Sequence, residues 1–83
     1  MTHAFFTHEE ARGKIRKIVR AIRELHGIPI NALGIVHKCL WIDRQEDYVL
    51  EVIWHIPAQN ATVSLFTKTG YECSLKEVDM SQR

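Results

Sequence analysis

Two histidines and one cysteine are the residues whose types fit metal chemistry. His37 and Cys39 alternate in the segment LGIVHKCLWI, and His55 follows in YVLEVIWHI. A strand places alternate residues on one face, so His37 and Cys39 would share a face, and a three-residue hairpin turn would set His55 opposite His37. Two nitrogens and one sulfur form part of a zinc ligand set. The sequence contains no CxxC or HxxxH pair that would support a metal site. We therefore predict no metal and no cofactor.

The same residues offer two candidate catalytic pairs. Cys39 with His37 or His55 would form a thiol–imidazole pair, and His55 with Glu51 would form an acid–base pair. Neither pair has a nucleophile elbow or a Gly-rich loop beside it in the sequence. We therefore predict no catalytic residues and a non-enzymatic protein. A small histidine-dependent hydrolase or ribonuclease-like toxin is the second alternative.

Four arginines in the stretch ARGKIRKIVRAIRELHG, residues 11–27, form the strongest charge pattern. A rotation of about 100° per helical residue brings them within an arc of roughly 80°, which we call the arginine ridge: Arg12, Arg16, Arg20 and Arg23. The planar guanidinium binds carboxylates and phosphates through two parallel hydrogen bonds. The ridge therefore predicts contact with an acidic protein surface, and contact with an RNA or DNA backbone is the first alternative. A solvated helix flank without a partner explains the same pattern.

These arginines depend on a helix that we predict over residues 8–26. Thr7 and Glu10 have the spacing of a capping box at its start. Apolar residues then recur every three or four positions: Ile15, Ile18, Val19, Ile22 and Leu25. Gly27 stands where the residue after a helix adopts a left-handed backbone, and Pro29 follows two positions later.

The rest of the chain predicts an antiparallel sheet. Strand-like segments separated by polar turns are LGIVHKCLWI (33–42), YVLEVIWHI (48–56) and ATVSLFTK (61–68). We expect a fourth strand at 71–75, with a short helix at 74–77 as the alternative. Short turns require hairpins. The predicted fold class is α+β, with one N-terminal amphipathic helix packed on one face of a three- or four-stranded antiparallel β-meander, in a single domain over residues 1–83.

Alternation predicts which side of this sheet the helix covers. The even positions of 48–56 are apolar, and a turn that pairs Ile56 with Ala61 would bring Val63 and Leu65 to the same side, the predicted core. One helix covers only one face, so the second face lacks a cover, and an uncovered apolar face often marks an interface. The residues that we predict to form it, between copies of the chain, are Val49, Ile53, His55 and Phe66.

Charge restricts the class of partner. Residues 1–40 contain seven Lys or Arg and three Asp or Glu, whereas residues 41–83 contain four and seven. The net charge is only +1, and the sequence has no RRM, KH or zinc-finger signature, so a protein partner is favoured over nucleic acid. We predict a small protein-interaction module that forms homo-oligomers, contacts an acidic protein surface, or does both.

Composition also bears on location. No segment is apolar over enough residues to span a membrane, and the first residues lack the pattern of a secretory signal. Two cysteines are too few for a disulfide framework. We therefore expect a cytoplasmic protein with both thiols free, without a membrane partner.

Overall fold

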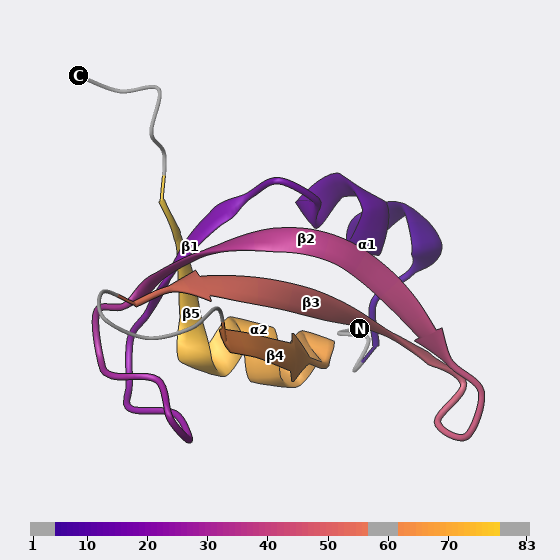
Figure 1. Cartoon of the computed structure of the whole chain (residues 1–83). Coiled ribbons are helices and arrows are strands. Elements are labelled where there is room, and N and C mark those ends of the chain that lie inside the picture. Colours follow the sequence, from indigo (N-terminus) through magenta and orange to yellow (C-terminus); the bar gives the residue numbers. More distant parts are fainter. Residues whose placement is uncertain (1–4, 57–61, 79–83) are drawn as a thin grey trace.

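The structure is a computed structural model that describes residues 5–56 and 62–78 (Figure 1). Within them lie two helices and five strands: α1 (His8–Lys14), β1 (Ile18–Ala21), β2 (Leu33–Ile42), β3 (Asp47–His55), β4 (Thr62–Phe66), α2 (Lys68–Ser74) and β5 (Leu75–Val78). The strands form one antiparallel sheet in the order β4-β3-β2-β1-β5. The predicted α+β class is confirmed, whereas the prediction of three or four strands is wrong.

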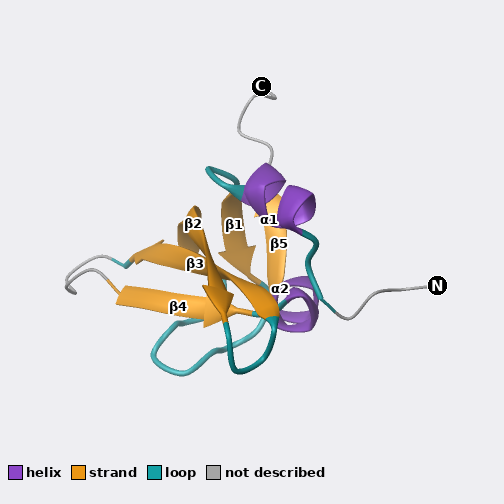
Figure 2. Ribbon diagram, turned by 90° about the vertical axis from the view of Figure 1, so that its right-hand side faces the viewer, coloured by secondary structure: helices purple, strands orange, loops and turns teal. Residues whose placement is uncertain are grey.

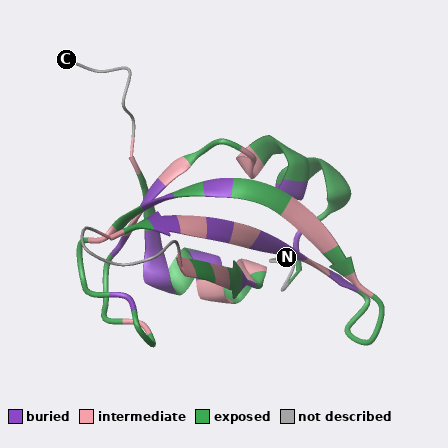
Figure 3. Cartoon of the chain, in the orientation of Figure 1, coloured by how far each residue is buried: buried purple, intermediate pink, exposed green. Residues whose placement is uncertain are grey.

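Both helices lie on the same side of the sheet, and the hydrophobic core lies between them and the strands (Figure 2). Phe6, just before α1, packs edge to face on Tyr71 of α2 with ring centroids 5.9 Å apart. Trp54 and Phe66 make a similar contact at 6.4 Å. Figure 3 shows how buried residues alternate with less buried ones along β3, as a half-covered strand requires.

Helix α1 ends at Lys14, so the prediction of a helix over 8–26 is wrong beyond that residue. The predicted capping box is present, with the Thr7 N–H donating to Glu10 Oε1 at 2.9 Å and the Glu10 N–H donating to Thr7 Oγ1 at 3.1 Å. Ile15 is extended and Arg16 has a φ of 76°, which stops the helix. The following β-branched residues suit a strand, and β1 pairs with β2 on one side and β5 on the other.

The predicted left-handed backbone at Gly27 is present, with a φ of 75°, but the residue is in a tight turn and not at a helix end. Leu25 and Ile28 exchange backbone hydrogen bonds of 3.0 and 2.9 Å around His26 and Gly27. A glycine at the second central position suits such a turn because it adopts a positive φ without steric cost. The turn directs Ile28 into the core, where it is buried.

Strand β4 pairs one residue away from the predicted register. Trp54 opposes Thr62 and Leu50 opposes Phe66, so Thr62, Ser64 and Phe66 share the core side. A shift of one residue moves every side chain of a strand to the other face. The placement of Phe66 on the uncovered face is therefore wrong, because the ring packs in the core. The predicted core residues of this strand are instead exposed: Val63 and Leu65.

A β-bulge interrupts β2 at His37. Val36 opposes Val52, but the next opposed pair is Lys38 with Glu51, which leaves His37 as an extra residue. The bulge reverses the alternation of β2. Cys39, opposite Leu50, consequently lies on the core side, whereas His37 contacts Glu51 on the other side, and the prediction that His37 and Cys39 share a face is wrong.

Residues 68–74 form a helix, so the predicted strand at 71–75 is wrong, as is the alternative helix at 74–77. The Thr67 hydroxyl accepts the N–H of Gly70 at 3.2 Å and caps α2. Tyr71, Ser74 and Leu75 are buried. Their spacing of three and four is helical, and it competes with the alternation of Tyr71, Cys73 and Leu75 in a segment too short to decide between the two.

Gly34 is expected to resist substitution because a Cβ there would lie 2.8 Å from Val52 Cγ1, 2.9 Å from Trp54 Cε3 and 3.0 Å from the Ile53 carbonyl oxygen. We expect Gly34→Ala to lower the free energy of unfolding by about 1–3 kcal/mol through overpacking. Urea denaturation followed by tryptophan fluorescence measures this loss.

Gly13→Ala is the matched control. A Cβ at Gly13, inside α1, meets no atom within 4 Å, and alanine is favoured over glycine in a helix by about 0.5–1 kcal/mol. Equal stability of the two variants would contradict the close packing described at Gly34.

Candidate interaction surface

The side of the sheet opposite the helices, which we call the open face, carries a row of aligned apolar side chains. Directly opposed residues of antiparallel strands point to the same side. The opposed residues run through all five strands, from β4 to β5, as Val63, Ile53, Ile35, Ile18 and Val78. Four strand spacings make this apolar row about 19 Å wide.

The apolar row is accessible over much of its length. Ile35 and Val63 expose 41% and 51% of their surface. Leu33 on β2 is two residues from Ile35, and Leu65 on β4 is two residues from Val63, so both point to the same side as the row. They expose 42% and 54% of their surface. Single exposed apolar residues are common on proteins, but a contiguous patch marks an interaction surface.

Charged side chains border the apolar row. On one side Arg20 opposes both Leu33 and Lys76. On the other side Lys38 opposes Glu51, whose carboxylate lies 2.9 Å from His37 Nδ1. Cations therefore predominate over carboxylates in this rim, which we call the basic rim and define as Arg20, Lys38 and Lys76. Its charge favours an acidic partner.

Two of the predicted interface residues lie on the open face. Ile53 is part of the apolar row, and His55 is exposed opposite Leu33. Val49 is only 4% exposed, so it offers no contact surface, and Phe66 is in the core. The sequence prediction missed the exposed residues of β2, Leu33 and Ile35. Their exposure alternates with the burial of Gly34 and Val36 in the structure, but the sequence LGIV is apolar throughout and contains no signal of this facing.

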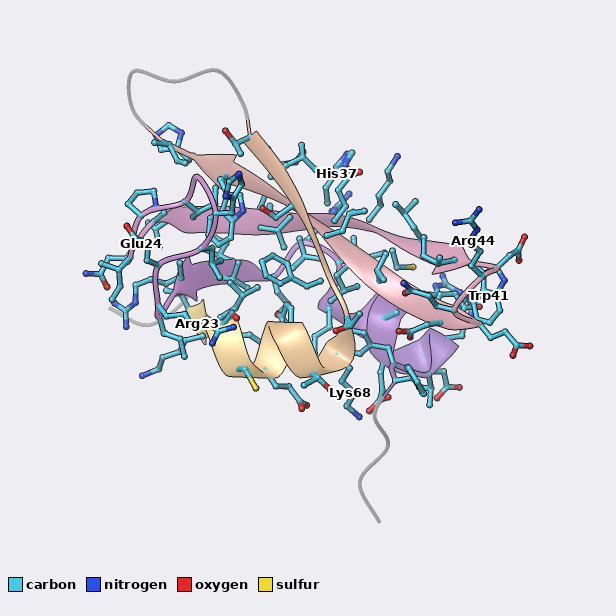
Figure 4. All side chains as sticks on the ribbon, turned by 90° about the horizontal axis from the view of Figure 1, so that it is seen from below. Arg23, Glu24, His37, Trp41, Arg44 and Lys68 are labelled. Carbon is cyan, nitrogen blue, oxygen red and sulfur yellow. The ribbon has the colours of Figure 1, made fainter. Side chains whose placement is uncertain are left out.

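The arginine ridge does not exist as one surface, because the chain leaves the helix after Lys14. Arg12 is on α1, Arg16 follows α1, and Arg20 is on β1. Arg23 lies beside the end of α2 (Figure 4), where its Nε donates to Ser74 Oγ at 3.0 Å. Of the four arginines, the strand register places Arg20 beside the apolar row.

The predicted metal set and thiol–imidazole pairs are not brought together, and Glu51, predicted to pair with His55, contacts His37 instead. His55 opposes Leu33 and not His37, and the bulge separates His37 from Cys39. His37 lies on the other side of the sheet from the two helices (Figure 4). The residues that the structure describes include no group of three or more His, Cys, Asp or Glu that would hold a metal ion.

A polar groove of about 360 Å³ lies between α1, α2 and β5. Two ion pairs lie within it, Lys14 with Glu77 and Lys68 with Glu10. Lys14 Nζ lies 2.5 Å from Glu77 Oε2 and 5.4 Å from the centre of the Tyr71 ring, and the Tyr71 hydroxyl donates to the same Glu77 oxygen at 2.9 Å. Lys68 contacts Glu10 at 3.2 Å. These contacts join the two helices to the edge of the sheet.

The groove shifts three ionisation equilibria. The hydrogen bond from Lys14 lowers the pKa of Glu77. Burial, followed by the hydrogen bond to Glu77, raises the pKa of Tyr71. The backbone N–H of Thr7 lowers the pKa of Glu10. Each shift favours the charge state that the contacts of the groove require, which is typical of a structural network as well as of a site.

Comparison of the chain with protein-family models, curated proteins and solved structures finds no match. Within the described ranges, 5–56 and 62–78, no helix is long and apolar enough to cross a membrane. Function is therefore inferred from the open face and the groove themselves. Of these two, the open face has accessible apolar surface, whereas the groove is occupied by its own ion pairs.

The pKa of Glu77 predicts a stability change in acid. A carboxylate with a lowered pKa stabilises the fold above its ordinary value of 4.5, and this contribution is lost as the pH falls through the lower value in the folded state. We expect Glu77→Gln to unfold at a lower temperature at neutral pH and to lose less stability than the parent below about pH 5. Thermal unfolding followed by circular dichroism over this range measures both effects.

Glu24→Gln provides the control, because it removes an exposed carboxylate from the loop after β1. We expect its acid profile to follow that of the parent. A Glu77→Gln profile as steep as the parent profile would show that the Lys14–Glu77 pair does not stabilise the fold.

Proposed function

We propose that this chain is a non-enzymatic protein-interaction module whose open face binds an acidic, partly apolar surface of another protein. The observation that supports it most is the apolar row, which is aligned through all five strands on the side away from the helices. The basic rim supplies the charge preference, because Arg20 and Lys76 lie on one side of the row and Lys38 on the other.

The size of the open face explains why the basic rim matters. A face of five strands and about five residues along each strand has a projected area of roughly 300 Å². Stable protein interfaces bury about 800 Å² of accessible surface on each partner. The apolar row is only the middle part of this face, so a partner that covers enough surface for a stable interface contacts the rim as well. Long cationic side chains extend the surface that the partner can reach.

Charge disfavours the predicted stacking of two copies face to face. Each copy would bring its own basic rim to the contact, and like charges across an interface oppose association. An acidic partner removes this repulsion. Nucleic acid remains the alternative, but the dispersal of the arginine ridge leaves no row of arginines to follow a phosphate backbone.

A display library of random peptides tests the proposed chemistry of the partner. Peptides are selected on the immobilised protein alone, and the enriched peptides are then tested against the Ile35→Glu variant, in which a carboxylate replaces the centre of the apolar row. We expect the enriched peptides to combine Asp or Glu with large apolar residues. We also expect synthetic versions to bind Ile35→Glu at least about tenfold more weakly, because one buried apolar contact is lost and a repulsive charge is added.

Ile30→Glu is the matched control. Ile30 is also an exposed isoleucine, at 56%, but it lies in the loop before β2 and not on the open face. Peptides that bind Ile35→Glu as well as Ile30→Glu would contradict the proposed site. Peptides without acidic residues, or copurified nucleic acid that absorbs at 260 nm and is removed by salt, would contradict the proposed partner.

A further inference from the structure

The two edges of the sheet differ in their chemistry. The edge strand β5 has the sequence LKEV, with two charged residues, and Glu77 is held by Lys14 and Tyr71. The edge strand β4 has the sequence TVSLF, without charge or proline. Proteins protect exposed edges with charge, proline or short strands. By this criterion β5 is protected and β4 is not.

The backbone of β4 has the capacity for a second neighbour. Within the described residues, β4 pairs with β3 alone and stands at the end of the strand order. Figure 2 shows β4 at the edge of the sheet. In an antiparallel ladder, successive residues alternate between directing their N–H and C=O groups to one neighbouring strand and to the other. About half of the residues of β4 therefore present these groups outward.

The symmetry of a dimer distinguishes the two edges. A two-fold axis perpendicular to the sheet would pair an edge strand with its own copy in antiparallel orientation and keep both open faces on the same side. Opposed residues then have to point to the same side, so the axis passes through a residue and not between two.

On β5 the interior residues are Lys76 and Glu77. Either choice of axis places one charge directly opposite its own copy, and like charges in this position are destabilising. On β4 the interior residues are Val63, Ser64 and Leu65. None of them is charged, so no choice of axis causes repulsion.

We infer that a second copy of this chain pairs with β4 in antiparallel orientation, about a two-fold axis at Ser64. This register pairs the interior residues Val63, Ser64 and Leu65 with those of the second copy. It sets Val63 opposite Leu65 of the second copy on the open face, which covers apolar surface exposed in the single chain. The product is a ten-stranded sheet with two apolar rows on one side.

This inference is independent of the acidic partner, because it uses the edge of the sheet and not its open face. Failure of peptide binding would therefore not contradict dimerisation through β4, and failure of dimerisation would not contradict peptide binding. It also replaces face-to-face stacking as the route to a homo-oligomer, since the edge contact keeps the two basic rims side by side rather than opposed.

Disulfide trapping tests the register. Cys39→Ala and Cys73→Ser first remove the two native thiols, both free in the structure. Ser64→Cys then places one thiol at the proposed axis. Directly opposed residues of paired strands have Cα atoms about 4.5–5.5 Å apart, a separation that a disulfide can bridge. With oxidised glutathione, we expect Ser64→Cys to form covalent dimers at least about tenfold faster than a thiol that meets its copy only by diffusion.

Two thiols in the same background serve as references. Ile30→Cys measures random collision from an exposed loop position, and Ile35→Cys reports face-to-face stacking at the centre of the open face. Dimers that form fastest with Ile35→Cys would overturn the edge contact in favour of stacking. The Ser64 side chain lies on the core side, where its Oγ accepts the Trp54 Nε1 N–H at 3.0 Å, so the reaction of each thiol with a small disulfide reagent is measured as a correction for accessibility. A corrected Ser64→Cys rate no higher than that of Ile30→Cys would show that β4 does not pair.

Hydrogen exchange on the unsubstituted chain gives a second measurement that does not depend on Ser64→Cys. We expect the outward N–H groups of residues 62–66 to exchange more slowly as protein concentration rises, while those of β5 do not change. Exchange in β4 that is independent of concentration, up to the range where light scattering shows dimers, would also overturn the inference.

Discussion

The position of β1 between β2 and β5 is the constraint on which the rest of the structure depends. Three of its residues, Ile18, Val19 and Arg20, oppose residues of β2, and all four, Ile18–Ala21, oppose residues of β5. The strand thereby connects the β2–β4 hairpins to β5. Its buried side chains, Val19 and Ala21, belong to the core that both helices cover. Its outward side chains, Ile18 and Arg20, supply a link of the apolar row and part of the basic rim. Without this strand the open face would end at β2.

The same four residues explain the largest failure of the sequence prediction. Residues 15–25 have apolar spacings of three and four that suit a helix, and the alternating pair Val19 and Ala21 suits a strand equally well. Local pattern does not choose between these periods, because the choice depends on whether β5, more than fifty residues later, is available as a neighbour. The capping box at Thr7 and Glu10, in contrast, is a local arrangement, and it was predicted with its partners.

Strand positions were easier to predict than strand facing. The core side of β3 followed from its even positions, including Leu50, Val52 and Trp54. The facing of β4 depended on the pairing register between β3 and β4. A difference of one residue placed Val63 and Leu65 on the open face and Phe66 on the core side. The open face was therefore anticipated as an uncovered surface, but half of its predicted residues were incorrect. Ile53 and His55 were retained because the alternation of β3 is regular from residue 50 to 55, whereas Val49 and Leu50 before it are both buried.

Two kinds of surface are separated on this small sheet. The open face combines apolar side chains with cations, which suits a partner of different composition. The β4 edge is neutral and offers backbone groups, which suits an identical strand. The polar groove between the helices serves neither purpose, since Lys14, Glu77 and Tyr71 bind one another. The ion pairs of the groove thus join the helices to the sheet, whereas the basic rim lies on the open face.

The bulge at His37 has a consequence for how this sequence can diverge. It lets the two halves of β2 keep opposite alternation, with Val36 and Cys39 both directed to the core although three positions separate them. Loss of His37 would remove the extra residue and leave a regular strand with Val36 and Cys39 on the same side. Loss or gain of one residue away from the bulge would instead send one part of the strand to the wrong side. The hairpin tip at 43–46 has no such restriction, because its residues are exposed. Related chains should therefore vary in length at that tip, and within 33–42 they should vary only by loss of the bulge residue, even where the residue types there have changed.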